Sequence, residues 1–289
     1  MADLLYQALI GFTQGMIYWL IAAGLTIAFG VLGILNFTHG SLYMFGSYLA
    51  LTFYQSLGMN FGLAVFLAIA SVGGIGFLLE RFALRPIYAR NLEIQIILLF
   101  GIMLIFSDTA LLGWGTNLSF PPIPPLLGGT IEIVGRKFPI YYTFLIGAGI
   151  AVFFIIRGIL EKTWWGRTMR AAASDREMAS AIGINIRTLF ATSFVFASAI
   201  AAFGGALSMP WRICQPSLGT DVIIPAFVVV AVGSLGSLVG ALAAAILIGV
   251  VTALGTFYVP IMEVIAIYLI MTIVLIIRPQ GLFGGRGKA

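Results

Sequence analysis

The chain has 289 residues, of which 61% are hydrophobic and 9% are charged, with a net charge of +5 at pH 7. Charged residues make up about a quarter of a soluble domain, so a soluble protein of this composition could not cover its surface. One Cys and 35 Gly without a three-residue period exclude a disulfide-stapled domain and collagen. The composition predicts an all-α, polytopic transmembrane helical bundle.

The chain begins with a long uncharged stretch. No Asp, Glu, Lys or Arg occurs from Leu4 to Leu79, which leaves room for roughly three to four spans of about 20 residues. We do not expect a cleavable signal peptide, because Asp3 stands where basic residues would be needed. The short apolar segment Gly24–Leu35 precedes Asn36-Phe37-Thr38-His39-Gly40-Ser41. Polar and glycine residues at that depth suggest a broken helix whose unwound backbone lines a cavity.

Apolar segments continue along the rest of the chain. The predicted spans are 94–113 (interrupted by Asp108), 138–156, 188–211, about two crossings within 222–262, and a last one that ends at 277.

A second break is predicted near residue 235. We expect helices at roughly 222–235, 238–256 and 260–278. The first of these is too short for a normal span, and it ends in Gly233-Ser234-Leu235-Gly236-Ser237, which indicates a broken or re-entrant helix. Paired breaks in the two halves of a chain point to a transport site and often to an internal repeat.

The number of crossings depends on the first break. If both breaks are real, we expect about ten crossings, five in each half, with the N-terminus inside. If 24–54 is a single span, the count is lower and the N-terminus lies outside. The expected range is about 8–10 crossings.

The basic residues predict the orientation in the membrane. Twelve of the 15 lie near 81–90, in 157–187 and in the C-terminal tail, which the positive-inside rule places in the cytoplasm. The segments 114–137 and 210–221 are then external. We therefore expect a multi-pass protein of the bacterial cytoplasmic (inner) membrane with a cytoplasmic C-terminus. A single permease domain would comprise a first half (about 1–156), a coupling loop (157–188), a second half (189–278) and a tail (279–289).

The central loop is predicted to contain a short helix outside the membrane. Ser174 could be its N-cap, with Glu177 three residues later as in a capping box, and Gly183 suits the C-terminal stop. Met178, Ala179 and Ile182 would form a small apolar face. Such a helix either docks on a partner or rests on lipid headgroups, and the features of the loop favour docking.

Several motifs resemble the membrane subunits of branched-chain amino acid ABC importers, and they cover nearly the whole chain in the expected order. They are Gly24-Leu-Thr with Phe29-Gly-Val-Leu-Gly-Ile-Leu-Asn-Phe-Thr-His-Gly-Ser-Leu-Tyr43, Glu80-Arg-Phe with Arg85-Pro, Gly166-Arg-Thr-Met-Arg-Ala-Ala-Ala, Asp175-Arg-Glu-Met-Ala with Gly183-Ile-Asn, and Arg278-Pro-Gln-Gly-Leu-Phe-Gly284. The chain is more similar to the LivH-type than to the LivM-type subunit, because it is short and its Asn36-Phe-Thr-His-Gly motif closely follows the first apolar segment.

The resemblance implies the partners and the role of the loop helix. It implies a second, homologous permease subunit, two ATPase subunits that bind ATP and Mg, and a periplasmic substrate-binding protein. Asp175, Ala179 and Gly183 match the coupling-helix positions that fit a groove on the ATPase, and the predicted coupling residues are Asp175, Arg176, Glu177, Met178, Ala179, Gly183 and Ile184. The chain has no G-x-x-x-x-G-K-[ST] motif of its own.

A path for zwitterionic, apolar substrates needs polar groups within apolar walls. The candidates for the path or gate are Asn36, Thr38, His39, Gly40 and Ser41 at the first break, and Gly233, Ser234, Gly236 and Ser237 at the second. The alternative is that these residues only permit close helix packing, as in GxxxG pairs such as Gly11/Gly15 and Gly236/Gly240. We favour the path for Asn36 and His39, because polar side chains at depth are costly, whereas both readings stay open for Ser234 and Ser237.

The remaining polar residues suggest no chemistry. One His and one Cys cannot build a metal site, and no catalytic set converges. Asp108 is expected to pair with Arg212 or to line an external vestibule. The sequence thus predicts a non-enzymatic permease subunit of an ATP-driven importer that works by alternating access. Branched-chain amino acids are the expected substrates, with urea or short-chain amides as an alternative, and an ion-driven secondary transporter is the rival class.

Overall fold

In a computed structural model, the described residues are 2–88, 90–116, 121–133 and 135–284. Their helices are α1 (Ala2–Leu32), α2 (Thr38–Leu51), α3 (Phe61–Leu79), α4 (Leu92–Trp114), α5 (Ile140–Lys162), α6 (Trp164–Ser174), α7 (Arg176–Ala181), α8 (Ile186–Ser208), α9 (Leu218–Gly233), α10 (Leu238–Tyr258) and α11 (Met262–Ile277). Short π-helical turns at Thr52–Ser56 and Glu80–Leu84 and 3-10 turns at Arg85–Ile87 and Pro125–Leu127 extend or join them. Strands β1 (Thr130–Ile133) and β2 (Arg136–Pro139) form an antiparallel hairpin. The residues 285–289 of the predicted tail lie outside the described residues.

The helices confirm the predicted membrane bundle. Within the described part of the chain, six helices are long and apolar enough to cross a membrane: α1, α3, α4, α5, α8 and α10. α9 and most of α11 are shorter apolar helices. Below about 17 residues a straight helix does not span a hydrocarbon core unaided, so the short helices must begin or end inside the bundle.

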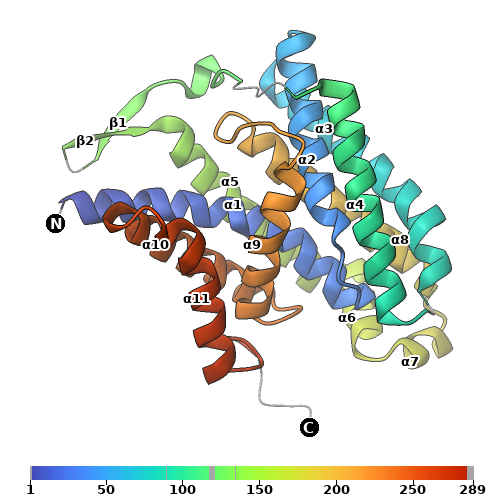
Figure 1. Ribbon diagram of the computed structural model, residues 1–289. Helices are drawn as coiled ribbons and strands as arrows, with labels where there is room; N and C mark the ends of the chain where they lie inside the picture. The colour runs from blue at the N-terminus through green and yellow to red at the C-terminus, as the bar shows by residue number, and fades with distance from the viewer. Residues whose placement is uncertain (1, 89, 117–120, 134, 285–289) are drawn as a thin grey trace.

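α1 is the central helix of the bundle (Figure 1). Its middle part is almost wholly buried against α10, α8, α9 and α5. A Cβ on Gly11 would lie 2.6 Å from the Val250 Cα, and one on Gly15 would lie 2.9 Å from the Ile246 Cα, both on α10. The predicted Gly11/Gly15 pair is therefore a helix-packing contact, where small residues let two backbones approach closely.

The bundle has two opposite ends, which we name from their contacts. At the hairpin end, Tyr6 Oη near the start of α1 donates to the Lys137 carbonyl, and Asp3 pairs with Arg136. At the loop end, the last turn of α1 contacts Arg176 of α7. The start of α1 and the central loop therefore lie at opposite ends (Figure 1). Both breaks are present, yet the start of α1 lies opposite the central loop, so the structure matches neither of the two combinations that the sequence left open.

One expected boundary is wrong. α1 is continuous from Ala2 to Leu32, so Gly24–Leu35 is not a separate short segment. Gly24 lies inside α1. A Cβ at this position would lie 2.7 Å from the His39 Cε1 atom, so the glycine makes room for the imidazole and does not end the helix. The break itself falls at residues 33–37, where Gly33 has φ +69°.

Candidate functional site

α2 begins deep inside the bundle. The His39 Nε2–H donates to the Ile21 carbonyl at 3.1 Å, and Ile21 lies 11 residues before the end of α1, or about 16 Å at a rise of 1.5 Å per residue. The break 33–37 therefore leads the chain from the loop end back toward mid-depth before α2 starts. This geometry produces a half-helix whose N-terminus is inside the bundle (Figure 1).

The start of α9 meets the start of α2. A Cβ on Gly40 would overlap the carbonyl oxygen of Gly219, so only glycine allows this approach. Neither helix has an N-cap side chain that accepts a hydrogen bond from its first turn, at Phe37 or at Ser217. Two helix N-termini, each with a partial positive charge, thus come together at mid-depth. The contact between Gly40 and Gly219 was not predicted from the sequence, because α9 was expected to start near residue 222.

The polar side chains of the first break are buried and incompletely paired. Asn36, Thr38, His39 and Ser41 are each at most 2% exposed. The Thr38 hydroxyl donates to Asn36 Oδ1 at 2.5 Å. Asn36 Nδ2, His39 Nδ1 and Ser41 Oγ, however, have no hydrogen-bond partner among the described residues. Each unpaired buried group costs about 1–3 kcal/mol, so this cluster is poised to accept water or a polar ligand.

An aromatic cluster adjoins this polar cluster. Phe37 packs against Phe227 of α9, with ring centroids 4.9 Å apart, and against Phe100 of α4 at 6.3 Å. The cluster draws one ring each from the first break, α4 and α9. Its apolar surface lies next to Asn36 in the chain. The cluster could not be predicted from the sequence, because its three residues are far apart in the chain.

The second break lies where the sequence predicted it, between α9 and α10, but its polar groups are differently arranged. The Ser237 hydroxyl accepts from the Gly240 N–H at 3.1 Å and caps α10. Ser234 has φ +96° and Gly236 φ +83°, which is turn geometry. Ser234 and Ser237 are half-buried, and Gly236 is exposed. A Cβ on Gly233 would overlap the Gly240 backbone. These contacts support the packing interpretation for the second break.

The second break lies against the end of α1. A Cβ on Gly30 would lie 3.5 Å from the Gly236 Cα, so the last turn of α1 rests on the second break. The tail reaches the same place, since the Leu282 N–H donates to the Val232 carbonyl at 2.8 Å. The Arg278–Gly284 motif thus ends α9 by satisfying a carbonyl of its last turn.

α7 corresponds to the predicted loop helix, with one correction. The expected N-cap, Ser174, is wrong: Ser174 is the last residue of α6, and Asp175 in extended geometry (φ −152°, ψ 109°) accepts from the Met178 N–H at 2.9 Å. Gly183 has φ +90°, as the predicted C-terminal stop requires. The Glu177 carboxylate lies in the first turn of α7.

The predicted apolar face of the loop helix is divided. Met178 and Ile182 are 60% and 69% exposed, whereas Ala179 is 2% exposed and packs inward. Ile184 is half-buried beside the stop. Of the three residues of the predicted apolar face, Met178 and Ile182 are therefore accessible to a partner and Ala179 is not. Four other predicted coupling residues are exposed: Asp175, Arg176, Glu177 and Gly183.

Arg176 connects α7 to the first break. Its guanidinium donates to the Leu32 carbonyl at 2.5 Å and to the Val31 carbonyl at 3.4 Å, and it stacks over the Phe190 ring of α8 at 5.1 Å. A cation at the carbonyl end of a helix is favoured by the helix dipole. Because Leu32 is the last residue of α1, Arg176 joins α7 to the residue that immediately precedes the break.

A polar vestibule opens toward the hairpin end. It is a cavity of about 510 Å³ between α1, the segment 211–218 and the starts of α9 and α11, and its charged residues are Arg212, Asp221 and Glu263. Arg212 lies over the Trp211 ring, and Asp221 accepts from Gln215 and Ser217. The expected pairing of Asp108 with Arg212 does not occur: Asp108 is exposed on α4, and no ion pair joins the two among the described residues.

No cluster of three or more His, Cys, Asp or Glu residues that could hold a metal ion occurs in the described ranges. Cys214 is buried, with its Sγ 3.0 Å from the Ser47 hydroxyl of α2. This contact ties the segment before α9 to the side of α2.

Comparison with known proteins gives a consistent result. Residues 7–277 match the family described as branched-chain amino acid transport system / permease component. The high-affinity branched-chain amino acid transport system permease protein BraD of Pseudomonas aeruginosa is 32% identical, over 97% of this chain and 95% of that protein. LivH of Escherichia coli, with the same description, is 29% identical over the same shares. A solved structure of PsaBC from Streptococcus pneumoniae in complex with Fab aligns with 97% of this chain and 94% of that one at 15% identity; its TM-score of 0.49 is too low to establish a shared fold.

Proposed function

Because the chain belongs to the family of branched-chain amino acid transport permease components, a multi-pass membrane family, we propose that it forms half of the translocation path of an ATP-driven importer. Its substrates are branched-chain or closely related amino acids. The chain carries out no covalent chemistry and works by alternating access, driven through α7.

The link between Arg176 and α1 carries this proposal. α7 presents Met178 and Ile182 outward and is joined through Arg176 to the last carbonyls of α1. The break that follows leads to the unpaired polar cluster at Asn36, His39 and Ser41. A force applied to α7 by an ATPase would therefore reach this cluster through one side chain and one short segment.

The path suits a zwitterion with an apolar side chain. The vestibule offers Arg212 to a carboxylate and Asp221 or Glu263 to an ammonium group. Farther in, the uncapped N-termini of α2 and α9 favour a carboxylate, and Phe37, Phe100 and Phe227 supply an apolar surface. Among the described residues, the site holds no buried full charge that would trap the substrate, which leaves selection to a binding protein.

The partners follow from the family and from the charge distribution. A second, homologous permease subunit completes the path, two ATPase subunits bind ATP and Mg, and a periplasmic binding protein delivers substrate to the hairpin end. The basic residues of the central loop support a cytoplasmic loop end. The C-terminal tail, which contacts α9 at the same end, is then cytoplasmic in a bacterial inner membrane.

Reconstitution tests the proposal. The permease, its ATPases and its binding protein are placed in liposomes, and uptake of labelled leucine, urea and acetamide is measured with ATP inside or with a proton gradient alone. We expect ATP-dependent leucine uptake. ATP-dependent uptake of urea or acetamide alone would reassign the substrate, and gradient-driven uptake by this chain without ATPases would overturn the importer assignment.

The coupling surface is tested with an exposed residue. Ala179→Asp or Gly183→Glu should uncouple ATP hydrolysis from uptake, but Ala179 is buried, so its substitution also disturbs the packing of α7. Met178→Asp changes only the exposed surface and should abolish association with the ATPases while membrane insertion is retained. Normal association and uptake in Met178→Asp would contradict docking through α7.

A further inference from the structure

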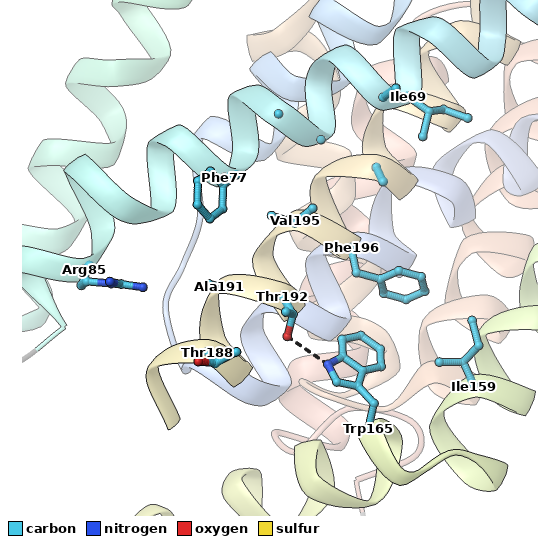
Figure 2. A pocket seen from close by; sticks show the side chains of 14 residues that line it. Ile69, Phe77, Arg85, Ile159, Trp165, Thr188, Ala191, Thr192, Val195 and Phe196 are labelled. Atoms are coloured by element: carbon cyan, nitrogen blue, oxygen red, sulfur yellow. Dashed lines mark hydrogen bonds between the residues drawn. The ribbon is translucent and has the colours of Figure 1, made fainter. Parts of the chain in front are cut away.

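An apolar groove lies outside the proposed path. It has a volume of about 1050 Å³ and lies between α3 and α8, with contributions from α5 and α6 (Figure 2). Ile69 and Phe77 of α3 face Val195 and Phe196 of α8 across it, and Ile159 of α5 closes one side. Because its walls belong to helices that cross the membrane, the groove opens toward the hydrocarbon core of the bilayer.

The length of the groove decides between a lipid chain and a helix. Along α8 it extends from Thr188 to Ala199, 11 residues or about 16 Å at the helical rise. The hydrocarbon core is about 30 Å thick, so the groove covers one leaflet, from the loop end to mid-depth. A transmembrane helix of a partner would require a groove through both leaflets, whereas an acyl chain requires only one.

The loop end of the groove is polar and positively charged. Arg85 extends toward it from the end of the π-helical turn on the same side as Thr188, and Trp165 of α6 lies across from them beside Thr192 (Figure 2). The Trp165 Nε1–H donates to the Thr192 hydroxyl at 3.0 Å, which fixes the indole at the rim, where tryptophan is common in membrane proteins. Two further arginines near the rim residues in the chain are exposed: Arg81, four residues before Arg85, and Arg187, directly before Thr188.

The acidic residue that pairs with Arg85 at this rim is buried. Glu80 is fully buried, pairs with Arg85 Nη2 at 3.4 Å and accepts from the Tyr88 hydroxyl at 3.0 Å. Positive charge near the groove opening is thus supplied by Arg81, Arg85 and Arg187. The exposed Glu161 of α5 pairs with Arg157 at 2.9 Å. Basic residues at the cytoplasmic membrane surface attract anionic headgroups.

We propose that this groove binds a phospholipid with an anionic headgroup, with one acyl chain between α3 and α8 and the phosphate at Arg85. The apolar walls and the one-leaflet length fit the chain, and the rim fits the headgroup. The bound lipid would also reach the loop after α7, because Thr188, Trp165 and Thr192 line both this groove and a smaller cavity of about 360 Å³ that includes Gly183 and Ile184.

A glycine in the groove wall provides an occluding variant. Gly74 is exposed in the groove, and a Cβ there would meet no atom within 4 Å. Gly74→Leu therefore places an apolar side chain in the groove from a position where the Cβ meets no atom. Gly101 of α4 also has no atom within 4 Å of its Cβ position and lies outside the groove, so Gly101→Leu is the matched control.

The proposal is tested by lipid binding to the purified full-length chain. The chain is delipidated in detergent and titrated with phosphatidylglycerol, with phosphatidylcholine and with inorganic phosphate, and bound lipid is counted by native mass spectrometry. We expect one retained phosphatidylglycerol, weaker binding of phosphatidylcholine and no effect of inorganic phosphate. Gly74→Leu should lose this lipid, and Gly101→Leu should keep it.

The headgroup contact needs its own variant. Arg85→Gln alone would leave Glu80 buried without its cation, so the double variant Glu80→Gln/Arg85→Gln removes the pair together. We expect the double variant to bind phosphatidylglycerol about five-fold more weakly, the effect of losing one basic residue near a membrane surface. Equal binding by wild type and Gly74→Leu, or no preference for the anionic lipid, would overturn the proposal. Stable binding of a second protein in the groove in place of lipid would also overturn it.

Discussion

The two helix breaks use similar residues in opposite ways. Both contain glycine and hydroxyl side chains, and both interrupt apolar helices. At the first break Ser41 Oγ is buried without a partner, whereas at the second the Ser237 hydroxyl caps α10. Polar residues that are satisfied build a turn; polar residues that are buried and unsatisfied mark a place where something else must bind.

The breaks are also held by different contacts. The helix before the first break ends on a side chain of α7, Arg176, and the helix before the second ends on a backbone N–H of the tail, from Leu282. A side chain on a short external helix can move with a partner, while the tail contact belongs to the same chain. We infer that the first break moves during transport, whereas the second break stays fixed and supports the end of α1 at Gly236.

The largest expected difference between the breaks concerns packing. Gly40→Ala places a Cβ in the Gly219 carbonyl and should destabilise the chain by about 3 kcal/mol, the upper end of the usual overpacking cost. Gly236→Ala leaves 3.6 Å to Gly30 and meets only the strain of φ +83°, about 1 kcal/mol. Thermal unfolding in detergent measures both. Equal stability of the two variants would show that α2 and α9 do not meet at Gly40.

The next largest effect concerns coupling. Arg176→Gln removes the charged hydrogen bonds to the end of α1 and should lower ATP-driven uptake about ten-fold or more, as expected for the loss of charge-assisted bonds, while ATPase association persists. Arg167→Gln is the control, because Arg167 is an exposed arginine of the same loop that stacks on Trp164. If both variants transported alike, the Arg176 link would not transmit force.

A smaller functional effect is expected at the unpaired polar cluster. Ser41→Ala removes a hydroxyl that has no partner among the described residues, so it should leave thermal stability unchanged or slightly higher. Uptake should fall several-fold, roughly the effect of losing the free energy of one neutral hydrogen bond to substrate or water. Loss of stability together with unchanged uptake would assign Ser41 to packing instead of the path.

The smallest effect is expected at the second break and has the opposite form. Ser237→Ala removes the N-cap of α10 and should cost about 1 kcal/mol of stability with uptake unchanged once the protein is folded. The two serine variants thus distinguish the breaks: Ser41→Ala should lower uptake without lowering stability, and Ser237→Ala should lower stability without lowering uptake. A transport defect in Ser237→Ala at full stability would place the second break in the path.

The sequence predicted the elements whose signals are local. The break at 233–237 could be found because Gly and Ser interrupt an apolar run, and Gly183 because a helix stop needs positive φ. The N-cap was wrong by one residue, since Ser174 and Asp175 are both good caps and only the continuation of α6 through Ser174 decides between them. Nothing local distinguishes Gly24, which accommodates a distant imidazole, from a helix-breaking glycine.

The features of the candidate site that the sequence could not predict are tertiary. Arg176 was expected to contact an ATPase, but its contact with Leu32 joins residues 144 positions apart. The meeting of Gly40 with Gly219 likewise depends on the segment 209–217 returning into the bundle beside α2. The vestibule residues Arg212, Asp221 and Glu263 converge from separate elements, whereas the sequence had suggested Asp108 as the partner of Arg212.

The central claim is that the first break opens to water during transport, and cysteine accessibility tests it most directly. The native Cys214 is buried and is replaced by Ala as background; Ser41→Cys and Ser237→Cys are then treated with a membrane-impermeant thiol reagent in the reconstituted importer. We predict that Ser41→Cys reacts only when ATP and substrate-loaded binding protein are present, whereas Ser237→Cys reacts from the loop end under all conditions. Failure of Ser41→Cys to react during active turnover would contradict the account.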